Sequence, residues 1–144
     1  MTADDFDLQR FVDAQDRDGS YDRALAELER GRKQGHWIWF VFPQIQGLGS
    51  SQTARFYAIS SLAEATAYLE HPVLGPRLDT AAETLLRLPG RDPDTILGVL
   101  DAMKVRSSMT LFSHVQDAAP VFSRVIEEFY GGQPDGLTEQ LLLS

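Results

Sequence analysis

Signals that start and stop helices recur at short intervals along this chain, and they constrain its fold more than any other feature. Ser61 and Glu64 have the spacing of a capping box, in which each side chain satisfies a free amide group of the other residue. Pro93 follows Asp92 and suits a first helical position, where its missing N–H has no cost. The pattern predicts an all-α fold, a compact single-domain bundle of about seven or eight short helices.

The same signals give the expected bounds of the helices. Asp4 or Asp5 is expected to cap the first helix, Ser20 the second, and Asp101 and Asp135 two later ones. No internal repeat or Ser/Gly linker divides the chain, so residues 1–144 are expected to form one all-α domain. The first helix is expected to end near residue 15, a short helix to start at 93, and a longer one to extend from Asp101 to about 115. Further helices are expected at 21–32, 62–70, 73–88, 120–130 and 137–143.

The apolar segment 37–42 is compatible with two secondary structures. Its aromatic and β-branched residues favour a strand by propensity. However, the sequence contains no convincing partner strand, and a lone buried strand would leave its amide groups unpaired. We therefore expect a short, fully buried helix at 37–42.

Composition excludes several classes of protein. The chain has no cysteine, which excludes disulfides, thiolate zinc sites and cysteine nucleophiles and fits a reducing compartment. Residues 1–7 include three acidic residues and no apolar stretch, so a signal peptide is not expected. The longest apolar run, at 37–42, is too short to span a bilayer. These features predict a cytoplasmic protein with no membrane partner.

The overall charge argues against nucleic-acid binding. The formal net charge is −8, from 21 acidic and 13 basic residues, whereas binding to nucleic acid requires basic side chains that neutralise phosphates. A small local basic pocket is still compatible with this charge. We expect no nucleic-acid partner, no cofactor, and a monomer or weak dimer.

The segment 35–44 is the first candidate for chemistry, because it contains both tryptophans beside His36. On a helix, Trp37 and Gln44 would share a face and Trp39 would project to roughly the opposite side. One interpretation is a central core element with His36 hydrogen-bonded at its edge. The other is an aromatic wall made by either indole, with His36 and Gln44 orienting a bound ring or amide. The two interpretations are compatible.

The loop 47–51 and the segment 101–112 are candidates for binding an anion. Glycines at 47 and 49 would let backbone N–H groups point at one spot, although an ordinary flexible connection is the favoured interpretation of this loop. On the expected helix, Lys104, Ser107 and Ser108 fall on one side. Together they would hold a phosphate or carboxylate by charge-assisted hydrogen bonds, whereas a solvated helix face needs no ligand.

Other residue types give weaker indications. Tyr57 and Arg55 are further candidate contributors, although Tyr57 would also serve simply as a core residue. The three histidines, His36, His71 and His114, are isolated in sequence, so a metal site is not expected. No nucleotide-binding loop or nucleophile elbow is present in the sequence.

Four strings carry a resemblance to a known family: HWIWFVFPQ at 36–44, YAISS at 57–61, HPVLGPRL at 71–78 and KVRSSMTLF at 104–112. They resemble a bacterial family catalogued as domain of unknown function 1810, over nearly the whole chain from residue 7. The resemblance implies a compact all-α cytoplasmic protein and no particular activity, so no catalytic residue carries over. Members are sometimes labelled calpastatin, but calpain inhibitors are long and disordered, and this composition is globular.

Two functional hypotheses follow. The first is a pocket, with or without catalysis, for an anionic aromatic ligand such as a nucleotide or an ADP-ribose-like metabolite. In a reaction, His36 would be the candidate general acid or base because histidine titrates near neutrality. The second is a non-catalytic protein-interaction module with an exposed apolar patch. We favour the first, whose ligand-binding residues would be Trp37, Trp39, Gln44, Tyr57, Lys104, Ser107 and Ser108.

Overall fold

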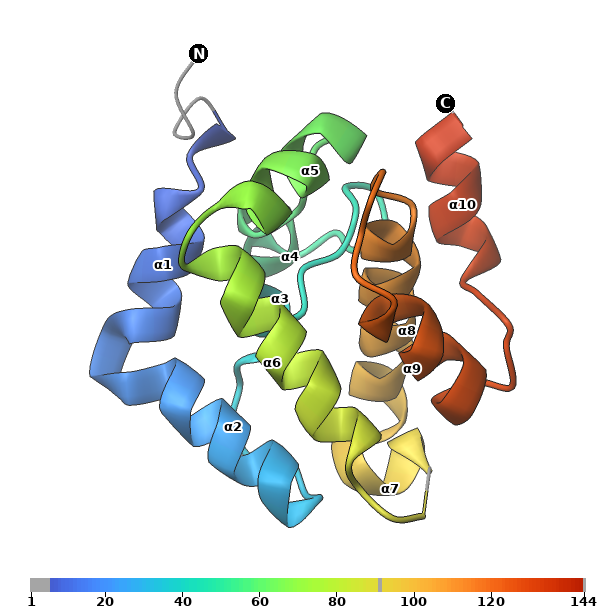
Figure 1. Cartoon of the computed structure of the whole chain (residues 1–144). Coiled ribbons are helices and arrows are strands. Elements are labelled where there is room, and N and C mark those ends of the chain that lie inside the picture. Colours follow the sequence, from blue (N-terminus) through green and yellow to red (C-terminus); the bar gives the residue numbers. More distant parts are fainter. Residues whose placement is uncertain (1–5, 91, 144) are drawn as a thin grey trace.

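A computed structural model describes residues 6–90 and 92–143, and helix α6 occupies a central place in it (Figure 1). Helices α1 and α2 lie along one side of α6, and α8, α9 and α10 lie on the other side. The all-α prediction is confirmed: the described residues contain no strand, only an isolated bridge between Ile45 and Ile59. The elements are α1 (Gln9–Asp16), η2 (Arg17–Gly19), α2 (Ser20–Arg30), α3 (Ile38–Val41), α4 (Gln52–Phe56), α5 (Leu62–Glu70), α6 (Leu74–Leu86), α7 (Pro93–Leu97), α8 (Val99–Ser113), α9 (Val121–Phe129) and α10 (Gly136–Leu143).

The core is one continuous cluster that connects helices from both halves of the chain. A row of aromatic rings runs through it: Phe11 of α1 packs on Tyr68 of α5, Tyr68 on Phe112 of α8, and Phe112 on Phe122 of α9. The ring centroids are 5.2, 5.3 and 5.9 Å apart. All four side chains are fully buried. These ring contacts join helices α1, α5, α8 and α9 within one core.

Several predicted helix ends are confirmed and others are wrong. Asp135 caps α10, as predicted, by accepting from the backbone N–H of Thr138. Ser20 does not cap α2, because its hydroxyl donates to a backbone carbonyl and Gly19 is the capping residue. Helix α8 begins at Val99 rather than after Asp101, because it follows α7 with only one residue between them. The proposed caps Asp4 and Asp5 lie outside the described residues.

The capping box at the start of α5 forms only in half. The Ser61 hydroxyl accepts from the backbone N–H of Glu64, as predicted. Glu64, however, accepts from the backbone N–H of Ser60 and pairs with Arg10 at 2.8 Å, instead of reaching back to Ser61. The carboxylate therefore ties the start of α5 to helix α1.

The segment 37–42 is helical, as predicted, but short and incompletely buried. Helix α3 covers Ile38–Val41; Ile38 and Val41 are buried, whereas Trp39 and Phe40 are half-buried. The prediction of a fully buried helix is therefore wrong for its middle residues. Helix α4 was not predicted, because the loop 47–51 was interpreted as a connection or an anion nest.

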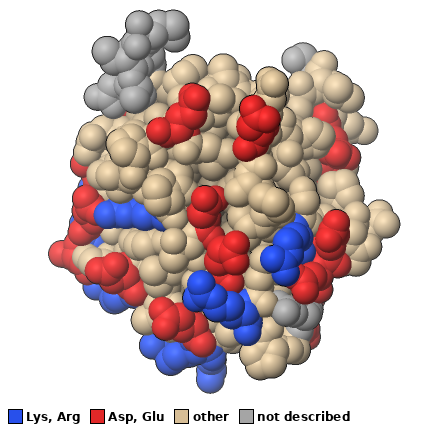
Figure 2. Space-filling view, in the orientation of Figure 1, with Lys and Arg blue, Asp and Glu red and all other residues tan. Residues whose placement is uncertain are grey.

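The surface carries charges of both signs. On the face shown in Figure 2, acidic and basic side chains are interspersed, so no broad field of one sign forms there. None of the helices in the described ranges has the length and apolar character needed to cross a membrane.

Candidate functional site

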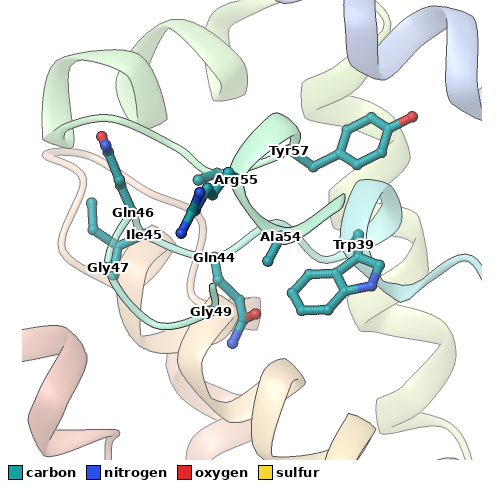
Figure 3. A pocket seen from close by; sticks show the side chains of 10 residues that line it. Trp39, Gln44, Ile45, Gln46, Gly47, Gly49, Ala54, Arg55 and Tyr57 are labelled. Atoms are coloured by element: carbon teal, nitrogen blue, oxygen red, sulfur yellow. The ribbon is translucent and has the colours of Figure 1, made fainter. Parts of the chain in front are cut away.

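A hollow opens between helix α3, helix α4 and the loop that joins them. Trp39 lies on one side of it, Arg55 and Gln46 on the other, with Gln44 and Ala54 between them (Figure 3). Its volume is about 130 Å³, similar to an engineered cavity of about 150 Å³ in another protein that binds benzene. We call it the Trp39 cavity, and its lining is completed by Ile45, Gly47, Gly49, Tyr57 and Ala58.

The half-buried indole of Trp39 contacts helix α8 and the loop before α4. Lys104, from helix α8, places its Nζ atom 4.3 Å from the ring centroid. Lys104 itself does not line the Trp39 cavity. Gly49 lies near the ring edge, where a Cβ atom would stand 3.6 Å from Cη2 of Trp39. The aromatic segment and the basic segment thus meet at Trp39 and Lys104.

Lys104 is the end of a row of alternating charges. Its Nζ lies 3.0 Å from Oδ1 of Asp101, and Oδ2 of Asp101 lies 2.7 Å from Nζ of Lys33. Lys33 covers the ring of Trp37, 5.1 Å from its centroid, and also interacts with the carboxylate of Glu27. Burial opposes the ionisation of Asp101, but the two ammonium groups outweigh it and hold the pKa of this carboxyl below its usual range. Asp101 is therefore a carboxylate at neutral pH.

The polar side chains of Gln44, Gln46 and Arg55 line the Trp39 cavity and have no side-chain hydrogen bond or ion pair in the described part of the chain. Gln44 is fixed by its backbone: its carbonyl accepts from Ile59 N, and Gln46 N donates to Ile59 O, each at 2.8 Å. Arg55 is fixed by helix α4, whose first turn is capped by the Ser51 hydroxyl. Arg55 is exposed and forms no ion pair with a described residue. The cavity therefore has one cation and two amide groups available for a ligand.

The residues of the aromatic segment are divided between two hollows in a way that differs from the prediction. Gln44 lies with Trp39 and not with Trp37, because the helix ends at Val41 and the helical face does not continue to residue 44. Tyr57 lines the Trp39 cavity, but its ring packs against Phe40 with centroids 5.5 Å apart. Figure 3 shows its hydroxyl pointing away from Arg55 and Gln44. The Tyr57 hydroxyl therefore does not face the cavity.

Trp37 and His36 belong to a second hollow. Trp37 is 3% exposed, and its indole N–H donates to Oε1 of Glu27 at 2.8 Å. Glu27 also accepts from the backbone N–H groups of Gln34 and Gly35, so it organises the turn before α3. Burial raises the pKa of Glu27, but these donors and Lys33 outweigh it and lower the pKa overall. The hollow, of about 240 Å³, shares no lining residue with the Trp39 cavity.

The serines of α8 do not form an anion cradle with Lys104. The Ser107 hydroxyl donates to the backbone carbonyl of Met103 at 3.1 Å, which is the usual local bond of a serine inside a helix. Ser108 is 0% exposed, and its hydroxyl has no hydrogen-bond partner among the residues described. Lys104 itself is engaged by Asp101 and Trp39. Neither hydroxyl lines the Trp39 cavity.

The remaining candidates lie apart from this site. In the part of the chain that the structure describes, no three His, Asp or Glu side chains are grouped to hold a metal ion. Large exposed apolar side chains occur on α8, where Val99, Leu100 and Met103 are 61, 72 and 61% exposed. In the aromatic segment, Trp37 is buried, whereas Trp39 and Phe40 are half-buried.

Sequence reasoning did not identify Asp101 and Lys33 as parts of the charged row. The spacing of Asp101 and Lys104 on a helix, three residues apart, was an available signal for their pairing. Nothing local in the sequence connects Lys33 to Asp101, because that contact joins the turn after α2 to the first turn of α8.

Comparison with known proteins gives a family match and a similar solved structure, each over almost the whole chain. The family described as "Protein of unknown function (DUF1810)" matches residues 5–142. The conserved hypothetical protein Rv1873 from Mycobacterium tuberculosis has 48% sequence identity to this chain, and its crystal structure matches this fold with a TM-score of 0.93. The similarity covers 96% of this chain and 98% of that one. Among curated proteins, none matches the chain.

Proposed function

This chain belongs to the family of proteins of unknown function DUF1810, and from its geometry we propose that the Trp39 cavity binds a small organic anion with a single aromatic ring. The ring of the ligand contacts the indole of Trp39, and the anionic group pairs with Arg55. Gln44 supplies an amide that donates to the ligand or accepts from it. This proposal narrows the expectation of an anionic aromatic ligand to one that fits the cavity.

The observation that carries the proposal is the state of Arg55. Its guanidinium lies at the Trp39 cavity and has no ion-pair partner among the described residues. No carboxylate from the described ranges lines this hollow, although the chain as a whole has a net charge of −8. An arginine presents a planar fork of donors that matches a carboxylate or phosphate. The cavity is therefore locally suited to an anion.

The size of the Trp39 cavity sets the class of ligand. Its volume of about 130 Å³ matches one six-membered ring, by comparison with the cavity of about 150 Å³ that holds benzene. Sites for larger metabolites usually measure about 300–1,000 Å³. A complete nucleotide or ADP-ribose-like molecule exceeds this cavity, so a monocyclic carboxylate is the ligand that we propose.

The proposal is one of binding and assigns no reaction. His36, the candidate acid or base, is exposed in the hollow beside Trp37 and does not line the Trp39 cavity. Lys104, an alternative proton carrier, is paired with Asp101, lies over the indole of Trp39 and does not line the cavity. Cytoplasmic location and the absence of a nucleic-acid partner remain predictions from composition.

Calorimetric titration with benzoate and with its neutral analogue benzamide tests the proposal. Benzoate should bind the wild-type chain more tightly than benzamide, and Arg55→Gln should weaken benzoate binding by about tenfold, equivalent to about 1.4 kcal/mol. Arg87→Gln is a matched control, because Arg87 is also exposed but does not line the cavity. Equal benzoate affinity in wild type and Arg55→Gln would contradict the proposal.

A further inference from the structure

The second hollow, beside Trp37, is lined by residues of helix α2 and of the turn before α3, and none of them lines the Trp39 cavity. We call it the Glu27 hollow; its lining consists of Ser20, Arg23 and Glu27 of α2 and four residues of the segment 35–40. We infer that this hollow binds a free α-amino acid. The ammonium group of the ligand pairs with Glu27, and its carboxylate pairs with Arg23.

The carboxylate of Glu27 uses only one of its two oxygens inside the protein. Oε1 accepts from the backbone N–H groups of Gln34 and Gly35 and from the indole of Trp37, at 2.7, 2.9 and 2.8 Å. Oε2 has no hydrogen bond or ion pair with a described residue. Glu27 is only 8% exposed, and an unpartnered oxygen on so buried a carboxylate is costly unless a ligand or water supplies a donor.

The unpartnered oxygen of Glu27 is accessible to solvent. Among the non-exposed side chains that the structure describes, Ser108 Oγ is the one polar atom that lacks both a partner and contact with solvent, so Oε2 is not closed off. Gly35, which also lines the hollow, leaves the approach clear, because a Cβ atom there would stand 3.3 Å from Oε2. The Glu27 hollow therefore presents a fixed acceptor to a ligand.

This acceptor carries a negative charge that no described cation pairs with. Burial opposes the ionisation of Glu27, but its three donors and Lys33 outweigh it and hold the pKa of this carboxyl below its usual range. Lys33 acts on Glu27 without forming an ion pair, because its Nζ atom is bonded to Asp101 at 2.7 Å and to the carbonyl of Gly35. A ligand with an ammonium group supplies the missing partner by a charge-assisted hydrogen bond.

Arg23 provides the opposite charge at a separate point of the same hollow. Arg23 and Glu27 are four residues apart on α2, a spacing at which such residues commonly pair, yet they form no ion pair. The Arg23 guanidinium donates instead to the carbonyl of Asp18, in the turn before α2. Glu27 is held in place by the turn 34–37. The two charges are thus kept apart, and a zwitterion complements them.

The volume and the remaining lining of the Glu27 hollow indicate a small ligand. At about 240 Å³, it is larger than the cavity of about 150 Å³ that holds benzene. It is smaller than the range of about 300–1,000 Å³ that is usual for drug-sized ligands. Half-buried Phe40 also lines the hollow and offers an apolar surface to the side chain of the ligand. A small aliphatic amino acid satisfies both the charges and the size.

Three probes of similar shape separate the two charged contacts: L-valine, isobutylamine, which lacks the carboxylate, and isovalerate, which lacks the ammonium group. The chain has two tryptophans, and their indole N–H signals in a heteronuclear NMR titration report the two hollows separately. L-Valine should shift the Trp37 signal to saturation and leave the Trp39 signal in place. Isobutylamine should bind about threefold more weakly, because Arg23 is exposed and its charge is screened. Isovalerate should bind at least about tenfold more weakly, because it cannot donate to Glu27.

Variants of the full chain assign each contact to its residue. Glu27→Gln should weaken the binding of L-valine and isobutylamine by about tenfold. Arg23→Gln should weaken L-valine by about threefold and leave isobutylamine unchanged. Arg30→Gln is the matched control, because Arg30 is exposed on the same helix and does not line the Glu27 hollow; its affinity for all three probes should equal that of wild type.

Several results would overturn the inference. These are the absence of a saturable Trp37 shift with L-valine, a shift of the Trp39 signal alone, equal affinities for the three probes, and unchanged L-valine affinity in Glu27→Gln. If circular dichroism shows that Glu27→Gln does not fold, the order of the probes on the wild-type chain and the selective effect of Arg23→Gln decide instead. None of these results depends on benzoate binding in the Trp39 cavity, so the two proposals stand or fall separately.

Discussion

At the scale of single residues, the Ser108 hydroxyl is the clearest energetic defect of the described chain. It is fully buried in α8 and has no hydrogen-bond partner among the described residues. A buried polar group without a partner costs about 1–3 kcal/mol, and serine is also a poorer helix former than alanine. We expect Ser108→Ala to raise the free energy of unfolding by about 1 kcal/mol, measured by urea denaturation.

Ser107→Ala is the control for this prediction. Ser107 lies on the same helix and is 5% exposed, but its hydroxyl is bonded to the Met103 carbonyl. Its replacement should leave stability within about 0.5 kcal/mol of wild type, because the lost bond and the gained helix propensity offset each other. A marked loss of stability in Ser108→Ala would mean that the hydroxyl has a bound water or another partner.

Predictions for single residues succeed where helix geometry alone sets the direction of a side chain. They fail where residues distant in sequence set its surroundings. The periodicity correctly placed Trp37 and Trp39 in different surroundings. It could not indicate that the side of α8 with Ser108 is completely covered, since the covering residues come from distant segments. Gln44 was assigned to the wrong tryptophan because the end of α3 at Val41 is set by the bend before Pro43.

At the scale of elements, the contact between α5 and α6 depends on one glycine. A Cβ atom at Gly75 would stand 2.1 Å from the backbone oxygen of Leu69. That backbone cannot move without displacing α5, so the two helices approach this closely only because residue 75 has no side chain. We expect Gly75→Ala to lower the free energy of unfolding by about 2–3 kcal/mol, as for other overpacked sites.

Gly136→Ala is the matched control for Gly75→Ala. Gly136 is also the first-turn glycine of a helix, and a Cβ atom there would meet nothing within 4 Å. It should be neutral or slightly stabilising in the same urea denaturation experiment, because alanine favours the helix. If both variants have equal stability, the close approach of α5 and α6 does not depend on Gly75.

Element-scale predictions are most accurate for four helices. Helices α5, α6, α9 and α10 were predicted close to their observed ranges. Helix α4 was missed because it has only five residues and its cap, Ser51, was grouped with the preceding glycines. The cavity between α3 and α4 could not be predicted, since it depends on the pairing of Ile45 with Ile59.

At the scale of the whole molecule, the global and local charges have opposite signs. The chain carries a net charge of −8, yet the Trp39 cavity is lined by Arg55 and by no carboxylate from the described ranges. Composition could not locate this positive site. Such a site becomes visible only when helix α4 is placed beside Trp39.

The buried tyrosines make the stability of the entire fold depend on pH in the alkaline range. The Tyr21 hydroxyl donates to the Arg77 carbonyl, and the Tyr130 hydroxyl donates to the Ala102 carbonyl, each at 2.6 Å. Burial raises the pKa of Tyr21 to about 12 and also raises the pKa values of Tyr68 and Tyr130. A phenol whose pKa is higher in the folded chain stabilises the fold below the unfolded pKa, which is about 10. That stability is lost as pH rises above this value.

We therefore expect Tyr21, Tyr68 and Tyr130 to resist ionisation until the chain unfolds at high pH. Absorbance at about 295 nm should rise cooperatively for these three tyrosines, at the pH where the helical circular dichroism disappears. In guanidinium chloride, all tyrosines should ionise near pH 10 without cooperativity. Tyr130→Phe should reduce the amplitude of the cooperative absorbance change by the contribution of one tyrosine. A gradual rise near pH 10 with the helical signal intact would show that these side chains are accessible to solvent, against the packing that joins α2, α5 and α8 to their neighbours.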